Sequence, residues 1–300
     1  MRKIHPDYSL YPWTRRLDAL TAFSVPQVQG DRLLIATDFA GGPGSRFHVI
    51  GILLADWDFS DDWLEARMEV RNRFLPNNRR MSFKYMNDCY RRKALSPFLQ
   101  AAKELRGLLA TIIIDTRIKA LFADKKALEH RVKDNVLRSK WKLPDFENMI
   151  RVAFFVSYFL SWLGRPEQEI LWVTDQDQVV ANERREEDIL HLSSRFLTFL
   201  AEDPHFSVDF STTAVDSDDR GEEDIAAIPD LVVGAICETL HLSQSVPCWP
   251  YYWQTPEGIT PKTKTVLEWV CGPDKKLNEL TILFAPNSDS GFTIRKLAMT

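Results

Sequence analysis

LLIATDFAGGPGSRFHVIGILLA, residues 33–55, is the stretch from which the fold can be predicted. Its apolar runs at 33–38 and 47–55 have the composition of buried strands, and the Ala-Gly-Gly-Pro-Gly-Ser sequence between them is a turn signal. We expect these two strands to form a hairpin. The first strand of that hairpin ends in an acid, Asp38.

Helical and strand patterns alternate along the rest of the chain. The predicted helices cover residues 61–74, 96–109, 123–142, 146–163, 182–201 and 229–240, and the predicted strands cover 81–86, 109–115, 169–175 and 206–213. Because two strands come first and helices then alternate with strands, we expect an α/β protein with a mixed sheet flanked by helices.

Three regions are expected along the chain. Residues 1–30 contain three prolines and predict an irregular lead-in, and residues 31–242 form the main domain. Residues 243–300 predict a small C-terminal α+β appendage with a short helix and a terminal hairpin. The aromatic cluster at 248–253 within this appendage would pack it onto the main domain, form a homo-oligomer contact or stack on bases.

The composition is that of an ordinary globular protein. The chain has 300 residues, of which 45% are hydrophobic and 27% charged, and this excludes a disordered chain, a collagen and a small disulfide scaffold. The four cysteines show no zinc-ligand spacing. The N-terminus has no signal-peptide pattern, and the longest apolar run, 152–163, is shorter than the ~20 residues that cross a bilayer. We therefore expect a cytoplasmic protein without a membrane partner.

Charge is distributed unevenly, although the net charge is only −4. Residues 61–142 contain 20 Lys and Arg against 10 Asp and Glu, whereas residues 167–230 contain 4 against 18. This suits an enzyme that acts on a polyanion through metal ions, because cations contact phosphates and carboxylates bind metals. Two solvated helical faces of opposite sign would give the same counts. The basic residues that could line a path for nucleic acid are Arg71, Arg73, Arg79, Arg80, Arg91, Arg92, Lys93, Lys125, Lys126, Arg131, Lys133, Arg138 and Lys140.

Three of the predicted strands end in acids. These acids are Asp38, Asp115 and Asp175, and Asp177 follows at alternate spacing. Asp230 lies in the first turn of the last predicted helix of the main domain. Ligands of α/β sheets bind beyond the strand ends, so we expect these acids to converge. Clustered carboxylates suit Mg²⁺ or Mn²⁺, and two such ions promote hydrolysis of a phosphodiester. Each acid taken alone could instead be a turn or helix-start residue.

Five features occur in an order that matches a known pattern. They are the strand at 33–38, the strand at 47–55, Lys84, WVTDQD at 172–177 and AAIPDLVVGA at 226–235. Over about residues 33–240 the chain thereby resembles the RNase H-like superfamily, and within it a widespread, largely uncharacterised bacterial group. That group has an Asp-ended first strand, a hairpin strand, a Lys, a strand ending in an acidic pair, and a final Leu-Gln-x-Ala-Asp-Leu-x-x-x-Ala helix.

The resemblance implies a magnesium- or manganese-dependent nuclease or related phosphodiesterase. The catalytic candidates are Asp38, Lys84, Asp175, Asp177 and Asp230. The four aspartates would hold the metals, and Lys84 would contact the scissile phosphate or stabilise developing charge. Asp115, from the strand-end pattern, is a lower-ranked metal ligand. The sequence departs from the group at Phe39, where a Glu is usual, and at Ala227-Ile228-Pro229, which replaces Gln-x-Ala.

Two other functions are compatible with the sequence. Asp175-Gln176-Asp177-Gln178-Val179 fits the D-x-D-x-[TV] motif of haloacid-dehalogenase-like phosphatases, in which the first Asp is a nucleophile and the second an acid/base, with Asp218 and Asp219 as a late acidic pair. Against this reading, that motif normally opens the fold, whereas here it follows more than half of the chain. A non-catalytic module that retains the fold and binds through its basic face or aromatic C-terminus is the third possibility.

Overall fold

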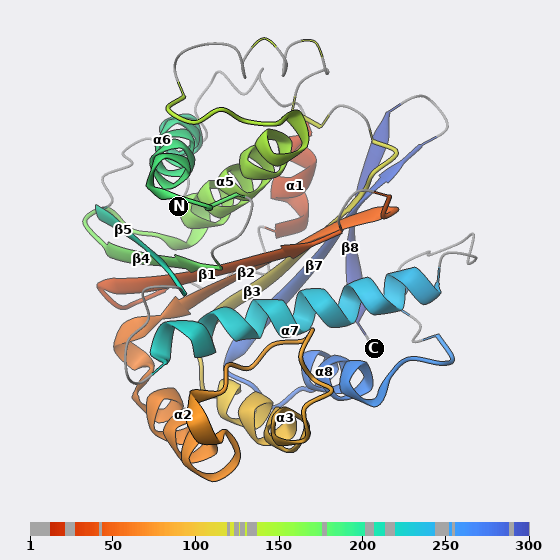
Figure 1. The fold of residues 1–300 in the computed structure, drawn as a ribbon. Helices are drawn as coiled ribbons and strands as arrows, with labels where there is room; N and C mark the ends of the chain where they lie inside the picture. Colours follow the sequence, from red (N-terminus) through yellow and green to blue (C-terminus); the bar gives the residue numbers. More distant parts are fainter. Residues whose placement is uncertain are drawn as a thin grey trace.

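A single mixed sheet organises the computed structural model of the protein (Figure 1). The structure describes residues 13–21, 28–41, 44–118, 121–122, 126, 130, 137–175, 179–201, 207–213, 220–243, 252–253, 256–287 and 291–299. The strand order is β5-β4-β1-β2-β3-β7-β8-β6. The predicted α/β class with a mixed sheet flanked by helices is therefore confirmed.

The strands combine a meander with parallel additions on both sides. Their bounds are β1 Arg32–Ala40, β2 Phe47–Asp56, β3 Gly107–Asp115, β4 Glu169–Thr174, β5 Ser207–Thr212, β6 Tyr252–Trp253, β7 Leu277–Pro286 and β8 Phe292–Met299. Strands β1 and β2 pair antiparallel, as predicted for the first hairpin, and β3 pairs antiparallel with β2. On one side β4 and β5 continue the sheet parallel to β1, and on the other β7 runs parallel to β3 and pairs antiparallel with β8.

Helices cover both faces of this sheet. Their bounds are α1 Thr14–Thr21, α2 Asp61–Phe74, α3 Cys89–Ala102, α5 Leu143–Leu163, α6 Glu183–Leu200, α7 Gly221–Leu242 and α8 Pro261–Cys271. Figure 1 shows α1, α5 and α6 on one side, and α7 across the other side with α2, α3 and α8 beyond it. We call these the α5 face and the α7 face.

Strand alternation divides the apolar residues between two cores. Along β1, Leu33 and Ile35 belong to the core under α5, whereas Leu34 and Ala36 belong to the core under α7. Both cores are built from fully buried aliphatic and aromatic side chains, so the hydrophobic effect holds helices on both faces. A side chain's position along a strand therefore determines which helices it meets.

Three local predictions for the α7 face were wrong. Residues 81–86 form turns and no strand. Helix α3 begins at Cys89, because the Asp88 carboxylate caps it by accepting the N–H groups of Tyr90 (2.8 Å) and Arg91 (3.2 Å). Helix α7 begins at Gly221, so that Pro229 lies inside the helix rather than at its start.

The ends of the chain also differ from the expectation. The N-terminal region contains α1, which is held by a 2.8 Å hydrogen bond between the hydroxyls of Thr21 and Tyr158. The expected C-terminal appendage is part of the main sheet, because β7 pairs with β3 from Gly107↔Leu277 to Ile114↔Phe284. Most of the predicted basic helix at 123–142, and the side chains of the aromatic cluster at 248–253, lie outside the described residues.

Helix α7 is long and apolar enough to cross a membrane by length and composition alone. In this structure 67% of its apolar window is buried inside the protein. Its apolarity is accounted for by its position against the centre of the sheet.

Candidate active site at the ends of β1 and β4

Two of the predicted acids lie level with each other on neighbouring strands. Strands β1 and β4 are parallel, and Thr37 pairs with Thr174. Asp38 and Asp175 each follow their paired threonine by one residue. The register therefore places the two aspartates side by side, at the ~4.8 Å spacing of adjacent strands. Because Thr37 and Trp172 hydrogen-bond on the α5 face (3.0 Å), alternation directs Asp38 to the α7 face.

Two glycines allow close packing around α7, one between the helix and the sheet and one between the helix and the loop that contains Phe83. Gly51 of β2 pairs with Asp38, and a Cβ atom there would lie 2.6 Å from Val233 Cγ2 of α7. On another side of the helix, a Cβ atom at Gly234 would lie 2.3 Å from Cγ of Phe83. Phe83 is in turn held by Lys262, whose ammonium donates to the Phe83 carbonyl oxygen at 3.2 Å and lies 3.8 Å from the ring centroid.

This close packing brings Asp230 of α7 to the loop that contains Phe83. The Asp230 carboxylate accepts the backbone N–H of Phe83 at 2.7 Å. Burial raises the pKa of Asp230, and the negative charge of Asp175 raises it further. Hydrogen bonds from Phe83 and Ser82 and the charge of Arg80 act on this pKa in the opposite direction. Asp175 and Asp230 therefore share one electrostatic environment.

Arg80 supplies the positive charge of this environment. Its guanidinium forms an ion pair with the Asp175 carboxylate. The same Asp175 oxygen accepts the hydroxyl of Thr213, which follows β5, at 2.6 Å. Both Arg80 and Asp175 remain partly accessible, with 28% and 31% of their side-chain surface exposed. The pair is therefore reachable by a ligand.

Asp38 also lies within electrostatic reach of α7. Burial raises the pKa of the Cys237 thiol to about 12, and the charge of Asp38 contributes to this rise. Cys237 follows Asp230 by two helical turns and therefore lies on the same side of α7. We define the acidic site as Asp38, Asp175 and Asp230 together with Arg80.

Asp115 lies apart from the acidic site. Asp38 pairs with Gly51, and Gly51 pairs with Thr111 of β3, so Asp115 is two strands across and four residues further along. That is a separation of roughly 16 Å. Two arginines contact it: Arg117 donates to both carboxylate oxygens, at 2.9 and 2.6 Å, and the Arg46 guanidinium lies 3.6 Å away.

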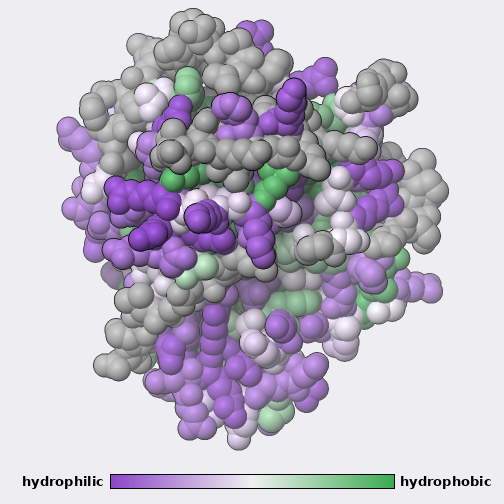
Figure 2. Space-filling model, turned by 45° about the horizontal axis from the view of Figure 1, so that its top comes forward, coloured by the Kyte–Doolittle hydropathy of each residue, from purple (hydrophilic) through white to green (hydrophobic). Residues whose placement is uncertain are grey.

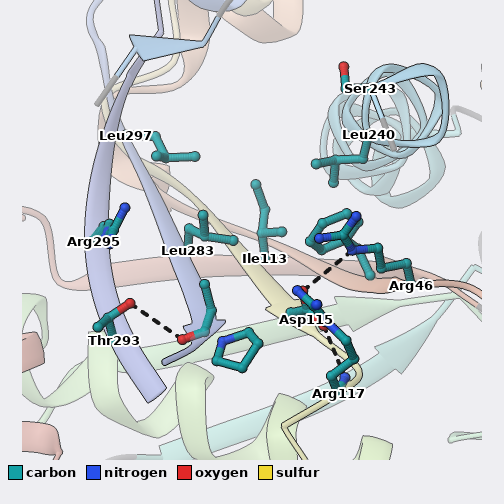
Figure 3. Close-up of a pocket in the computed structure, with 13 residues that line it drawn as sticks. Arg46, Ile113, Asp115, Arg117, Leu240, Ser243, Leu283, Thr293, Arg295 and Leu297 are labelled. Atoms are coloured by element: carbon teal, nitrogen blue, oxygen red, sulfur yellow. Dashed lines mark hydrogen bonds and ion pairs between the residues drawn. The ribbon is translucent and has the colours of Figure 1, made fainter. Parts of the chain in front are cut away.

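Asp115 lines a pocket away from the acidic site, which we call the arginine pocket (Figure 3). Its cavity of about 210 Å³ lies between the ends of β3, β7 and β8 and the C-terminal end of α7. Three arginines contribute to the lining, namely Arg46, Arg117 and Arg295. Leu240, Leu283 and Leu297 provide an apolar wall. This pocket is predominantly basic, in contrast to the acidic site.

The other predicted site residues have different outcomes. Lys84 is exposed, and its ammonium lies 5.6 Å from the centroid of the Tyr85 ring, so its predicted phosphate contact stays a prediction. Asp177, Asp218 and Asp219 lie outside the described residues. Sequence reasoning placed Arg80 in a general basic path and did not identify it as the partner of Asp175. No local signal distinguishes Arg80 from its neighbour Arg79.

The donor chemistry of the acidic site fits a hard divalent cation, since its three aspartates offer only carboxylate oxygens. Within the described part of the chain, no three His, Cys, Asp or Glu side chains lie close enough together to hold a metal ion. In this structure Arg80 engages Asp175 and partly offsets the negative charge. A divalent cation at this site would therefore require Asp175 to release this guanidinium and the three carboxylates to move closer together.

Comparison with known proteins does not assign the chain to a family. Neither the protein-family models nor the curated proteins contain a match to this chain.

Proposed function

We propose that this protein is a divalent-metal-dependent phosphodiesterase with an RNase H-like domain, and that its substrate is nucleic acid. The observation that carries the proposal is the register of β1 and β4, which sets Asp38, two residues before the end of β1, level with Asp175, which directly follows β4. The meander of β1 to β3, with β4 and β5 added beside β1, is compatible with that domain type.

The residues of the acidic site have separate roles in this proposal. Asp38, Asp175 and Asp230 would hold Mg²⁺ or Mn²⁺, which when bound activates a water molecule and stabilises the leaving oxygen. Arg80, once displaced from Asp175, is positioned to contact a phosphate oxygen, because guanidinium groups match phosphate geometry. The hydrogen bond from Phe83 N–H (2.7 Å) fixes the direction of the Asp230 carboxylate.

Cleavage assays with the full chain test this proposal. The substrates are labelled single- and double-stranded DNA and RNA, each with Mg²⁺, Mn²⁺ or EDTA. We expect cleavage that requires a metal and that is lost in Asp38→Asn and in Asp230→Asn. The loss should exceed the roughly 10- to 100-fold effect that is typical when only an outer partner of a metal ligand is removed.

Asp274→Asn is the matched control, because Asp274 is an exposed acid in the connection between α8 and β7. This variant should cleave like the wild type. Release of phosphate from monoesters that depends on Asp175 but not on Asp38 would instead indicate the haloacid-dehalogenase-like reaction. Absence of both activities, with nucleic acid binding retained, would indicate a non-catalytic module.

A further inference from the structure

Next to the acidic site, the chain exposes two tyrosine rings among cations. Tyr85 and Tyr90 keep 56% and 42% of their surface exposed. Single exposed rings are common on protein surfaces, whereas exposed rings grouped with cations suit a surface that contacts a ligand. We define the tyrosine platform as Tyr85, Tyr90 and the three cations that lie against these rings: Arg79, Lys84 and Arg91.

The contacts within the platform form a connected series. Arg91 and Lys84 each lie 5.6 Å from the Tyr85 ring centroid, and Arg79 lies 4.8 Å from the Tyr90 centroid. The Asp88 carboxylate lies between the two arginines, 3.6 Å from each guanidinium. Since Asp88 also caps α3, the start of this helix positions both rings and their cations.

The platform is joined directly to the acidic site. Arg91 donates through Nε to the carbonyl oxygen of Arg80 at 2.6 Å, and Arg80 itself binds Asp175. The Phe83 N–H, two residues before Tyr85, donates to Asp230. The tyrosines and the residues that contact the carboxylates therefore belong to one segment of the chain, so a polymer bound at the tyrosines would lie near the acidic site.

The charge of this segment suits a polyanion. Residues 79–93 contain six Lys and Arg and one acid. In Figure 2, hydrophilic side chains make up most of the lower part of the described surface. Cations that track a phosphate backbone, together with exposed rings that stack on bases, are the two features of surfaces that bind single-stranded nucleic acid.

From these contacts we propose that the tyrosine platform binds single-stranded nucleic acid and presents it to the acidic site. The proposal deepens the proposed function and rests on it for the second part, the presentation. Stacking on Tyr85 and Tyr90 requires bases whose faces are free, and duplex bases already stack on each other. The platform therefore selects single strands over duplexes.

Binding in EDTA measures this selection without cleavage. Fluorescence anisotropy of a labelled 15-nucleotide thymidine strand is compared with that of a duplex of equal length, using the full chain. We expect tighter binding of the single strand. We also expect Tyr85→Ala and Tyr90→Ala each to weaken it about 5- to 150-fold, the effect of losing one base–aromatic stack.

Three control variants distinguish the loss of base stacking from effects of misfolding or of removing any exposed ring. Tyr85→Phe and Tyr90→Phe keep the rings and should bind like the wild type. Phe199→Ala removes a ring that is 47% exposed on α6, across the sheet, and should also leave the affinity unchanged. Circular dichroism and thermal unfolding confirm that each variant is folded.

The two proposals fail in different ways. Equal or tighter binding of the duplex, or alanine variants that bind like the wild type, would overturn the platform. In that case metal-dependent hydrolysis of bis(4-nitrophenyl) phosphate, a small diester without nucleobases, would still support the acidic site. Tyrosine-dependent binding of the single strand without hydrolysis of any diester would support the platform as a binding surface and overturn the phosphodiesterase.

Discussion

The acidic site and the arginine pocket are two regions of the same sheet face with opposite charge. At the first, the acids are Asp38 of β1, Asp175 after β4 and Asp230 of α7, and Arg80 forms an ion pair with Asp175 and opposes the rise in the pKa of Asp230. At the second, Arg46, Arg117 and Arg295 line a cavity together with Asp115. In both regions an apolar strand has an Asp at or near its end, since Asp38 lies two residues before the end of β1 and Asp115 ends β3. The strand-end acid by itself therefore does not determine the chemistry of a region.

The difference arises from the residues that come next to each strand end in space. Beside β1 lies β4, which Asp175 follows directly, and α7 above them contributes a third acid. Beside β3 stand β2 and β7, and the arginines arrive from the turn before β2, from the residues after β3, and from β8. Helix α7 connects the two regions, with Asp230 over one and Leu240 over the other.

The largest expected effect comes from the buried anchor of α7. Asp224 is fully buried and binds Arg67 (3.1 Å) and Arg71 (2.5 Å) of α2. Asp224→Ala leaves two buried guanidinium groups without their carboxylate, which costs about 3–5 kcal/mol of the free energy of unfolding. Urea denaturation measures this loss.

Asp61→Ala, which removes an exposed acid of α2, is the control and should change the stability little. Because Asp224 lies in the same helix as Asp230, Asp224→Ala should also reduce cleavage at the acidic site. A loss of less than about 1 kcal/mol would show that this anchor does not hold α7.

A smaller effect is expected where α7 contacts the loop before α3. Gly→Ala inside a helix normally stabilises it by about 1 kcal/mol. At Gly234 we expect the opposite sign, a loss of about 1–3 kcal/mol, because the new Cβ atom would lie 2.3 Å from Phe83. Thermal and urea unfolding measure the sign of the change in the free energy of unfolding.

A double-mutant cycle identifies the cause. Phe83→Ala removes the ring that the Cβ atom would meet, so Gly234→Ala should cost less in the Phe83→Ala background than in the wild type. Equal costs in both backgrounds would assign the loss to some other contact. The arginine pocket contains neither residue and should be unaffected.

The smallest effect is expected at Asp115. Burial by itself would raise the pKa of Asp115, but hydrogen bonds from Arg117 and the charges of Arg117 and Arg46 hold it below its ordinary value. A lowered carboxyl pKa stabilises the fold above the unfolded-state pKa of ~4, and this contribution is lost as the pH falls through the folded-state pKa.

Asp115→Asn should therefore cost about 1 kcal/mol near neutral pH and make stability less sensitive to acid below pH ~4. Urea denaturation between pH 2.5 and 7 measures this change. Metal-dependent cleavage should remain, because Asp115 lies outside the acidic site. Loss of cleavage in this variant would remove the distinction between the two regions.

Much of the local structure could be predicted because its signals are local. The first hairpin was expected at 33–38 and 47–55 and occurs as β1 and β2, and the helix expected at 61–74 is α2. Helix α7 was missed in its first two turns, because Pro229 was interpreted as a helix start. That earlier part of α7 is held by the ion pairs of Asp224 with α2, which are distant in sequence.

The α/β class, the first hairpin and the candidate acids could be predicted from the sequence alone, because periodicity and turn residues act over a few neighbouring positions. The tertiary structure decided which acids meet. Pairing of β1 with β4 joined Asp38 to Asp175, whereas β2 and the register separated Asp115 from both. It also decided that Arg80 is the cation at Asp175. Strand order and helix docking depend on burial summed over the whole chain, so no short segment contains that information.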